Sequence, residues 1–315
     1  MVRKLYNILR LLRPRQWVKN FAIFAAVTFT GELFNPTAVI PVILGFFIFC
    51  AISSASYIIN DIFDIKSDKM HPFKRFRPLA HGDISVGFAS LLAFFLIVFP
   101  VAFSIIIGPT FFLFIIVYIL LQIFYSSLLK TITVIDILAI AAGYILRVLG
   151  GEIASGYHIS VWLLLTTISI SLFLAIGKRR SELTLLSSSK IENLAATRKT
   201  LSHYSERLLD VYASIFATST FIAYSLFTFL ENPKGINLSL GGVFLTDFFP
   251  NFFQRKWLML TIIPVVYGLM RYLQDIYEKH EGESPERVLF SDKPLLATVT
   301  LWALLVIFII YFVGP

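Results

Sequence analysis

Three aspartates with helical spacing are the residues most able to do chemistry. Asp61, Asp64 and Asp68 lie three and four positions apart, and Asn60 precedes the first of them. On a helix this spacing places the carboxylates on one face, where they repel one another unless a cation lies against them. Hard oxygen ligands with open coordination positions suit a Mg²⁺ ion that bridges to substrate phosphates. We therefore predict that the three aspartates are catalytic Mg²⁺ ligands and that Asn60 binds substrate. The alternative is a solvated acidic helix end.

Basic residues follow these aspartates closely. The chain continues as His71-Pro72-Phe73-Lys74-Arg75-Phe76-Arg77-Pro78. Ammonium and guanidinium groups are the side-chain donors that best bind phosphate oxygens. We expect Lys74, Arg75 and Arg77 to form a phosphate clamp beside the metal-binding face.

A second polar stretch runs from Tyr125 to Asp136, and Lys130 is the only cation in it. We assign Tyr125 and Lys130 to substrate binding, with Lys130 as a phosphate contact. Asp136 has two interpretations that stay open. It either ligates a second metal or orients a substrate hydroxyl, or it is a carboxylate favoured by the dipole at a helix N-terminus.

Four further cations are candidates for substrate contact. Arg147 stands inside an apolar run, where an ionisable residue is a functional hypothesis by default, although a structural pair with Glu152 is an equal alternative. Lys178 and Arg179 end another apolar run. They either extend the phosphate clamp or anchor the chain on the cytoplasmic side of the membrane, where positive residues are retained. Lys19, near the first apolar run, is assigned to substrate binding.

The composition places all these groups in a membrane protein. Of 315 residues, 57% are hydrophobic and 15% are charged, and the mean hydropathy is +0.80. Such values exclude a soluble enzyme, a disordered tail and a disulfide scaffold, and the single Cys50 excludes an internal disulfide. The formal net charge of +8 sits in short blocks beside apolar runs. Anionic lipids or anionic substrates are therefore better partners than nucleic acid, which we do not expect to bind.

Apolar runs of about 20 residues mark the membrane spans. We predict an all-α polytopic protein with a single domain over residues 1–315 and nine spans: Trp17–Phe34, Thr37–Asn60, Ser85–Ile107, Pro109–Leu128, Val134–Gly150, Val161–Gly177, Leu208–Leu230, Lys256–Leu273 and Pro294–Val313.

The orientation follows from the distribution of Lys and Arg. These residues gather before the first predicted span and after the second, fourth, sixth and eighth. Positive residues are retained in the cytoplasm, so we predict a plasma-membrane or inner-membrane protein with a cytoplasmic N-terminus and an external C-terminus. The polar loops then meet at a central cavity open to the cytoplasmic side. The external stretch Glu231–Arg255 is predicted to contain an interfacial segment.

These motifs resemble the UbiA superfamily of intramembrane prenyltransferases. The resemblance rests on Asn-Asp-x-x-Asp-x-x-x-Asp at residues 60–68 and on the second polar motif after the fourth span. Within the superfamily the sequence is most similar to the subfamily that transfers phosphoribosyl to decaprenyl phosphate. That likeness rests on the segments 13–20, 71–78, 125–130 and 177–182. Asp136 stands alone where many superfamily members have an aspartate pair.

The resemblance implies transfer of 5-phosphoribosyl from phosphoribosyl diphosphate to a polyprenyl phosphate, with Mg²⁺ as cofactor and diphosphate as product. It implies that Asp61, Asp64 and Asp68 hold the metal on the donor diphosphate. The acceptor phosphate is expected near Lys19 or Arg147, with its tail among the Phe-rich helices. Because that phosphate is already an anion, we predict no general base for it.

Two competing functions remain open. One is a UbiA-type aromatic prenyltransferase that uses a prenyl diphosphate on the same metal site. The other is a transporter with an ion path through its charged residues, although such charges are expected near mid-membrane at broken helices rather than at one face. A homo-oligomer is possible for either function.

Overall fold

The computed structural model describes residues 2–70, 74–188, 203–231, 239–240, 243–244, 256–278 and 285–313. Within these ranges, eight helical segments are long and apolar enough to cross a membrane. Their helices are α3 (Pro36–Phe63), α6 (Val86–Ile107), α7 (Pro109–Ser127), α8 (Ile135–Ser155), α9 (Val161–Ser188), α11 (Glu206–Leu230), η5 (Trp257–Thr261) with α14 (Ile262–Glu278), and α16 (Lys293–Phe308) with η6 (Ile309–Val313). The chain is therefore an all-helical integral membrane protein, and eight of the nine predicted spans coincide with these helices.

The first predicted span, Trp17–Phe34, has a different structure. The 3₁₀ helix η1 (Pro14–Phe24) runs into the short α-helix α2 (Ala25–Phe29), and neither has the length of a membrane span. A 3₁₀ helix of this length is unusual and marks strain or a functional hinge. Nine spans therefore remain a prediction.

Close contact with α8 fixes the position of η1. A Cβ atom added to Gly151 on α8 would lie 1.8 Å from the carbonyl oxygen of Ile23. Only glycine permits such an approach, because every other residue would collide with the backbone of η1. The sequence thus places the residues of η1 directly against α8.

Short elements connect the long helices. They are α1 (Val2–Leu12), α4 (Ile65–Met70), η2 (Lys74–Phe76), α5 (Pro78–His81), η3 (Leu129–Thr131), α15 (Pro285–Ser291) and the antiparallel strands β1 (Ser239–Leu240) and β2 (Val243–Phe244). The two strands are the only described part of the interior of the predicted external stretch Glu231–Arg255. The predicted interfacial segment otherwise lies outside the described residues.

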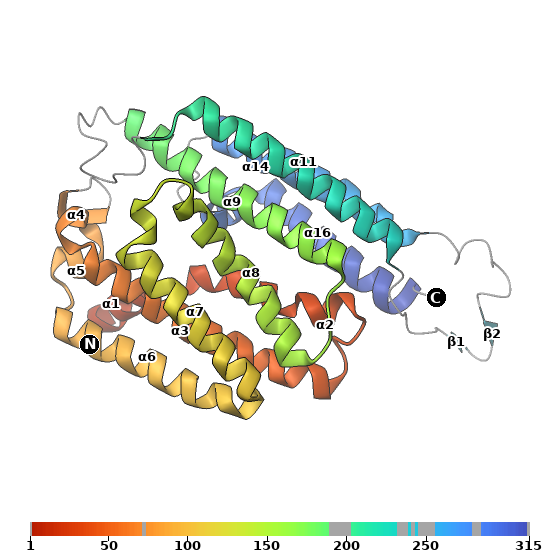
Figure 1. Cartoon of the computed structure of the whole chain (residues 1–315), viewed down its shortest axis with the longest axis horizontal. Coiled ribbons are helices and arrows are strands. Elements are labelled where there is room, and N and C mark those ends of the chain that lie inside the picture. The colour runs from red at the N-terminus through yellow and green to blue at the C-terminus, as the bar shows by residue number, and fades with distance from the viewer. Residues whose placement is uncertain are drawn as a thin grey trace.

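The polar connections gather at one end of the bundle. Figure 1 shows α4, α5, the turn between α7 and α8, the end of α9 and the start of α11 at the same end as α1. The last helical residues of the chain, in η6, lie at the opposite end. This arrangement agrees with the grouping of the basic loops, whereas the side of the membrane that each end faces remains a prediction.

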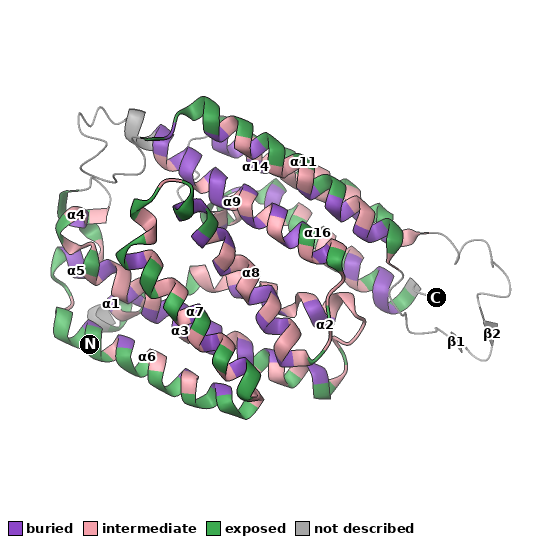
Figure 2. Ribbon diagram, viewed as in Figure 1, coloured by how far each residue is buried: buried purple, intermediate pink, exposed green. Residues whose placement is uncertain are grey.

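Apolar side chains cover the outside of the bundle, as in a protein whose solvent is lipid. On α6 the side chains of Phe94, Phe99 and Phe103 are more than half exposed. Buried residues face inward on the central helices α3, α8 and α9 (Figure 2). In the interior, the rings of Phe49 on α3 and Tyr118 on α7 pack edge to face with centroids 4.9 Å apart.

Candidate active site

The three predicted metal-binding aspartates lie where α3 passes into α4. Asp61 is in the last turn of α3, Asp64 follows its last residue, and Asp68 is in α4. The break between the two helices does not rotate the aspartates apart. The amide of Asp64 donates to the carbonyl of Asn60 (2.9 Å), and the amide of Asp68 donates to that of Asp64 (2.8 Å), so helical spacing continues across the junction.

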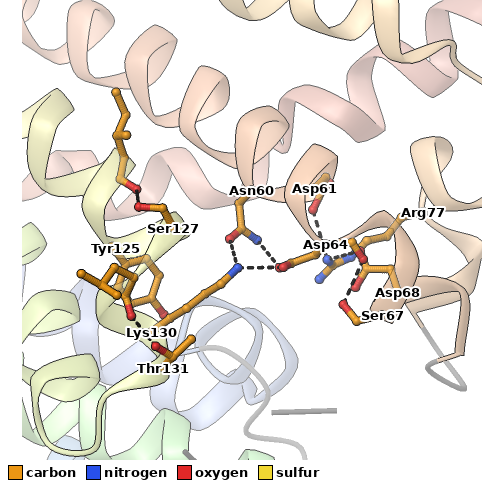
Figure 3. Close-up of polar contacts among 12 residues, drawn as sticks. Asn60, Asp61, Asp64, Ser67, Asp68, Arg77, Tyr125, Ser127, Lys130 and Thr131 are labelled. Carbon is orange, nitrogen blue, oxygen red and sulfur yellow. Dashed lines mark hydrogen bonds and ion pairs between the residues drawn. The ribbon is translucent and has the colours of Figure 1, made fainter. Parts of the chain in front are cut away.

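Arg77 joins two of these carboxylates. Its Nη1 atom lies 3.1 Å from Oδ1 of Asp61 and 2.7 Å from Oδ2 of Asp68 (Figure 3). Both aspartates are buried. Burial raises the pKa of the Asp68 carboxyl above its ordinary value, and the charge and hydrogen bond of Arg77 oppose that rise. One cationic atom thus already occupies a position that two carboxylates share.

A second guanidinium, which the sequence did not single out, also binds Asp61. Nη2 of Arg13 lies 2.5 Å from Oδ1 and 2.6 Å from Oδ2 of that carboxylate. Arg13 has a left-handed backbone (φ 53°) directly before Pro14, and its guanidinium stacks over the ring of Tyr57 at 5.1 Å. Its sequence signal was its place at the start of the segment 13–20, which carries the likeness to the phosphoribosyl-transferring subfamily.

Lys130 meets the third aspartate from another part of the chain. Its Nζ atom lies 2.7 Å from Oδ1 of Asp64 and 3.3 Å from Oδ1 of Asn60, and Nδ2 of Asn60 donates to Oδ2 of Asp64 at 3.0 Å (Figure 3). The structure therefore brings together the two polar motifs that the sequence analysis singled out. Asp64 is the most accessible of the three aspartates, with 27% of its side chain exposed.

The remaining members of the predicted clamp differ in position. Lys74, in η2, interacts electrostatically with Asp68. The Arg75 side chain is exposed and lies over the ring of Phe76, 4.8 Å from its centroid. His71, Pro72 and Phe73 lie outside the described residues.

Asp136 and Arg179 form a separate, fully buried ion pair. Oδ2 of Asp136 lies 2.7 Å from Nε of Arg179, and neither side chain is exposed. Arg179 also pairs with Glu182 and donates to the hydroxyl of Tyr125 at 3.1 Å. These contacts link α7, α8 and α9, so both residues have a structural role. Substrate contact for Tyr125, Asp136 and Arg179 stays a prediction, as it does for Lys178, which is partly buried on α9.

Tyr204 holds the turn that leads from Lys130 to α8. Its hydroxyl donates to Oδ1 of Asp136 (2.7 Å) and accepts from the amide of Val134 (2.6 Å). Val134 has a φ of 68°, which is a strained conformation for a β-branched residue. No local pattern predicts this role, because Tyr204 is 68 positions from Asp136.

Arg147 is buried among neutral groups. It donates to Oδ1 of Asn20 (2.7 Å), the hydroxyl of Tyr118 (2.6 Å) and the carbonyl of Gly143. Glu152, the alternative partner, instead has Oε1 2.6 Å from Nδ1 of His158. The proposed pair between Arg147 and Glu152 is therefore wrong.

Lys19 pairs with a residue far away in the sequence. Its Nζ atom lies 2.8 Å from Oε2 of Glu286, in α15, and 2.6 Å from Oε1 of Gln16. The hydroxyl of Tyr57 donates to the same Gln16 oxygen at 3.1 Å. Glu286 was not among the predicted residues, because 267 positions separate it from Lys19 and no local pattern connects them.

A model of one protein family matches most of this chain. The model describes the UbiA prenyltransferase family and matches residues 20–290. The chain belongs to the UbiA prenyltransferase family. The family resemblance drawn from the aspartate motif is thus confirmed.

Several curated relatives of this UbiA chain share one name. A decaprenyl-phosphate phosphoribosyltransferase from Corynebacterium glutamicum is 33% identical over 309 residues, covering 97% of this chain and 87% of the relative. A protein of the same name from Mycolicibacterium smegmatis is 31% identical over 300 residues, covering 94% of this chain and 90% of the relative.

Solved structures share the UbiA fold. A UbiA homolog from Archaeoglobus fulgidus bound to GPP and Mg²⁺ superimposes with a TM-score of 0.70 at 19% identity, covering 96% of this chain and 99% of the homolog. At this identity the likeness shows the fold alone.

The UbiA site has the chemistry for a divalent metal that is shared with substrate. Among the parts of the chain that the structure describes, no three His, Cys, Asp or Glu residues form a group that could hold a metal ion by themselves. Two carboxylates do converge on one cationic atom, Nη1 of Arg77, and Asp64 is accessible beside them. Mg²⁺ is usually bound through one or two carboxylates, with substrate phosphates and water completing its ligands. The residues therefore fit a substrate-bridged Mg²⁺ and do not form a closed cage.

Proposed function

We propose that this UbiA protein transfers 5-phosphoribosyl from phosphoribosyl diphosphate to the phosphate of a polyprenyl phosphate and releases diphosphate. The observation that carries the proposal is the pairing of each aspartate at the α3–α4 junction with a cation. Asp61, Asp64 and Asp68 contact Arg13, Arg77 and Lys130 over distances of 2.5 to 3.1 Å. Such a set can exchange its internal ion pairs for a metal and several phosphate groups. The shared name of the curated relatives supports the same activity.

Asp61, Asp64 and Asp68 would hold Mg²⁺, which when bound supplies positive charge to the donor diphosphate. Arg77, Lys74 and Lys130 are the cations beside these carboxylates, and each can donate hydrogen bonds to phosphate oxygens. Their function in the reaction is to neutralise the charge that develops on the leaving diphosphate. Asn60 orients Asp64 and Lys130 through its amide.

The reaction needs no proton transfer to or from the acceptor. One bond breaks, between C1 of the ribose and the diphosphate oxygen, and one bond forms, between C1 and an oxygen of the acceptor phosphate. The acceptor is already an anion, so its attack requires orientation and charge neutralisation but no base. Arg147 carries a permanent charge inside the bundle and is held by Asn20, Tyr118 and Gly143, which are neutral groups. We propose that Arg147 and Lys19 attract the acceptor phosphate toward the interior.

A direct assay separates this function from aromatic prenyl transfer. Purified protein in lipid nanodiscs would receive Mg²⁺ and either a polyprenyl phosphate with phosphoribosyl diphosphate, or a prenyl diphosphate with an aromatic acid. We expect a lipid-linked phosphoribose in the first reaction and no product in the second. Product only in the second reaction would overturn the proposal and indicate the aromatic prenyltransferase.

A further inference from the structure

Of the three buried hydroxyl groups that have no hydrogen-bond partner among the described residues, two lie on the helices α14 and α9. They belong to Tyr272 on α14, which is 5% exposed, and to Ser181 on α9, which is fully buried. Native proteins satisfy nearly all buried polar atoms, so exceptions need an explanation. A ligand that brings its own hydrogen-bonding groups is one such explanation.

The two hydroxyls lie on the same side of α9. Ser181 follows Gly177 by four positions, so both residues are on one helix face. A Cβ atom added to Gly177 would lie 3.0 Å from the hydroxyl oxygen of Tyr272. Phe173, one turn earlier, packs edge to face on the ring of Tyr272 with centroids 5.4 Å apart. The absence of a side chain at Gly177 therefore lets the Tyr272 hydroxyl approach the face that carries Ser181.

Charged and polar groups from three other elements complete the surroundings. Tyr272 interacts electrostatically with Tyr144 on α8 and with Glu286 on α15. Lys19 on η1 interacts with both and lies 2.8 Å from the Glu286 carboxylate. We call Lys19, Tyr144, Ser181, Tyr272 and Glu286 the interior polar cluster. It offers hydroxyl and ammonium donors, a carboxylate acceptor and two tyrosine rings.

The interior polar cluster is connected to the aspartates through short contacts. Gln16 accepts from Lys19 at 2.6 Å and from the hydroxyl of Tyr57 at 3.1 Å. Tyr57 precedes Asp61 by one turn of α3, which is about 6 Å along the helix axis. Arg13 stacks on Tyr57 and binds Asp61. The cluster therefore lies in the bundle just beyond the site proposed for the diphosphate.

We propose that the interior polar cluster binds the ribose ring of the sugar diphosphate donor. This inference rests on the proposed function and names the residues that recognise the sugar. Ribose hydroxyls both donate and accept hydrogen bonds, so they match the Glu286 carboxylate, which Lys19 already contacts, and the two hydroxyls of Tyr272 and Ser181 that bond to no described residue. Glu286 accepts from a ribose hydroxyl, and Tyr272 and Ser181 donate to ribose oxygens. A prenyl chain in the same place would leave the hydroxyls of Tyr272 and Ser181 unsatisfied.

The test uses Tyr272→Phe and Ser181→Ala, with Tyr267→Phe as the control. Tyr267 is on the same helix as Tyr272, and 46% of it is exposed. Without ligand, both test variants should keep the melting temperature of the wild type, because each removes a hydroxyl that bonds to no described residue. A purely structural role would instead lower the melting temperature.

Measurements with the donor and with diphosphate test the ribose site directly. We expect the KM for phosphoribosyl diphosphate to rise roughly five- to tenfold in each test variant, as for the loss of one hydrogen bond. The rise in melting temperature that this donor causes should become smaller in each test variant, because a ligand that binds more weakly stabilises the folded protein less. Inhibition by free diphosphate, which lacks the sugar, should not change. The Tyr267→Phe control should match the wild type throughout.

Three outcomes would overturn the inference, and they can be told apart. If the wild type transfers phosphoribosyl and both variants have an unchanged KM for the donor, only the ribose site is wrong. If the wild type turns over prenyl diphosphates and not phosphoribosyl diphosphate, the proposed function fails and the ribose site fails with it. A variant in which diphosphate inhibition weakens as much as donor binding would also contradict a ribose-specific role.

Discussion

At the scale of single residues, the most telling group is the carboxylate of Asp61, which two guanidinium groups enclose. Arg13 and Arg77 both contact it, and only 2% of its side chain is exposed. A buried carboxylate costs free energy unless it is paired, so this pairing is required for the site to fold. The same two guanidinium groups hold the carboxylate in place at the site proposed for the metal.

Asp61→Asn should abolish transfer while the protein remains folded. The substitution removes one charge from the metal-binding face, and we expect activity to fall by at least about a hundredfold, as for other groups that stabilise developing charge. Transfer assays and size-exclusion profiles in detergent measure the two effects. Asp83→Asn is the matched control. Asp83 lies two residues after the end of α5, outside the α3–α4 junction, and it pairs with His81. Near-normal turnover in Asp61→Asn would contradict the metal role.

At the residue scale the sequence predicted the acids better than their partners. The spacing of Asp61, Asp64 and Asp68 is local information, and it predicted a shared face that persists across the break after Phe63. The contact from Arg13 to Asp61 spans 48 positions. The contact from Lys19 to Glu286 depends on how the last helices return to the first. No pattern within a single segment contains such information.

At the scale of elements, two segments determine where the cations lie. The first runs from η3, which carries Lys130, to α8, and it contains the strained Val134, whose amide donates to the hydroxyl of Tyr204. Residues in such conformations persist only where their surroundings enforce them. The second element, η1, was predicted as a regular span and is instead a 3₁₀ helix pressed against Gly151. Hydropathy alone does not distinguish these two kinds of helix.

Tyr204→Phe should weaken donor binding through Lys130. Loss of the hydroxyl releases the amide of Val134, so we expect kcat/KM for the donor to fall about three- to tenfold. A double-mutant cycle with Lys130→Ala provides the control. If Tyr204 acts through Lys130, the two effects will be less than additive. Fully additive losses would show that Tyr204 stabilises the fold independently of the site.

Gly151→Ala should destabilise the protein. The new methyl group would collide with the carbonyl oxygen of Ile23, and overpacking of this kind costs about 1–3 kcal/mol. We expect a lower melting temperature and weaker donor binding, because η1 carries Gln16 and Lys19. Gly268→Ala is the control, since a Cβ atom there meets no atom within 4 Å. Equal melting temperatures for the two variants would mean that the contact between η1 and α8 is unimportant.

At the scale of the whole molecule, the bundle separates a charged end from an apolar body. The described parts of the basic loops that the sequence analysis grouped on one side lie at one end of the structure (Figure 1). Composition and hydropathy were sufficient to predict which loops share an end of the bundle, because the thickness of the bilayer fixes the length of each span. The arrangement of helices around the site was not predictable in the same way, since lipid-facing and buried faces are both apolar.

Cysteine labelling would test the predicted orientation. His81→Cys, at the end of α5, should lie on the cytoplasmic side, and His158→Cys, between α8 and α9, should lie outside. Their native side chains are 52% and 90% exposed. In intact cells a membrane-impermeant maleimide should label only His158→Cys, and both should react after permeabilisation. The native Cys50 is buried and should stay unlabelled. The reverse pattern would invert the topology.

The most direct test of the proposed reaction follows two labels in one donor. Phosphoribosyl diphosphate would carry one radioactive label in its 5-phosphate and another in its diphosphate, and purified protein would be incubated with a polyprenyl phosphate. We predict that the 5-phosphate label enters the lipid phase and that the diphosphate label stays in the aqueous phase. We further predict that this transfer stops when EDTA removes Mg²⁺ and resumes when Mg²⁺ is restored. Diphosphate label in the lipid, or transfer that continues without a divalent metal, would contradict the account.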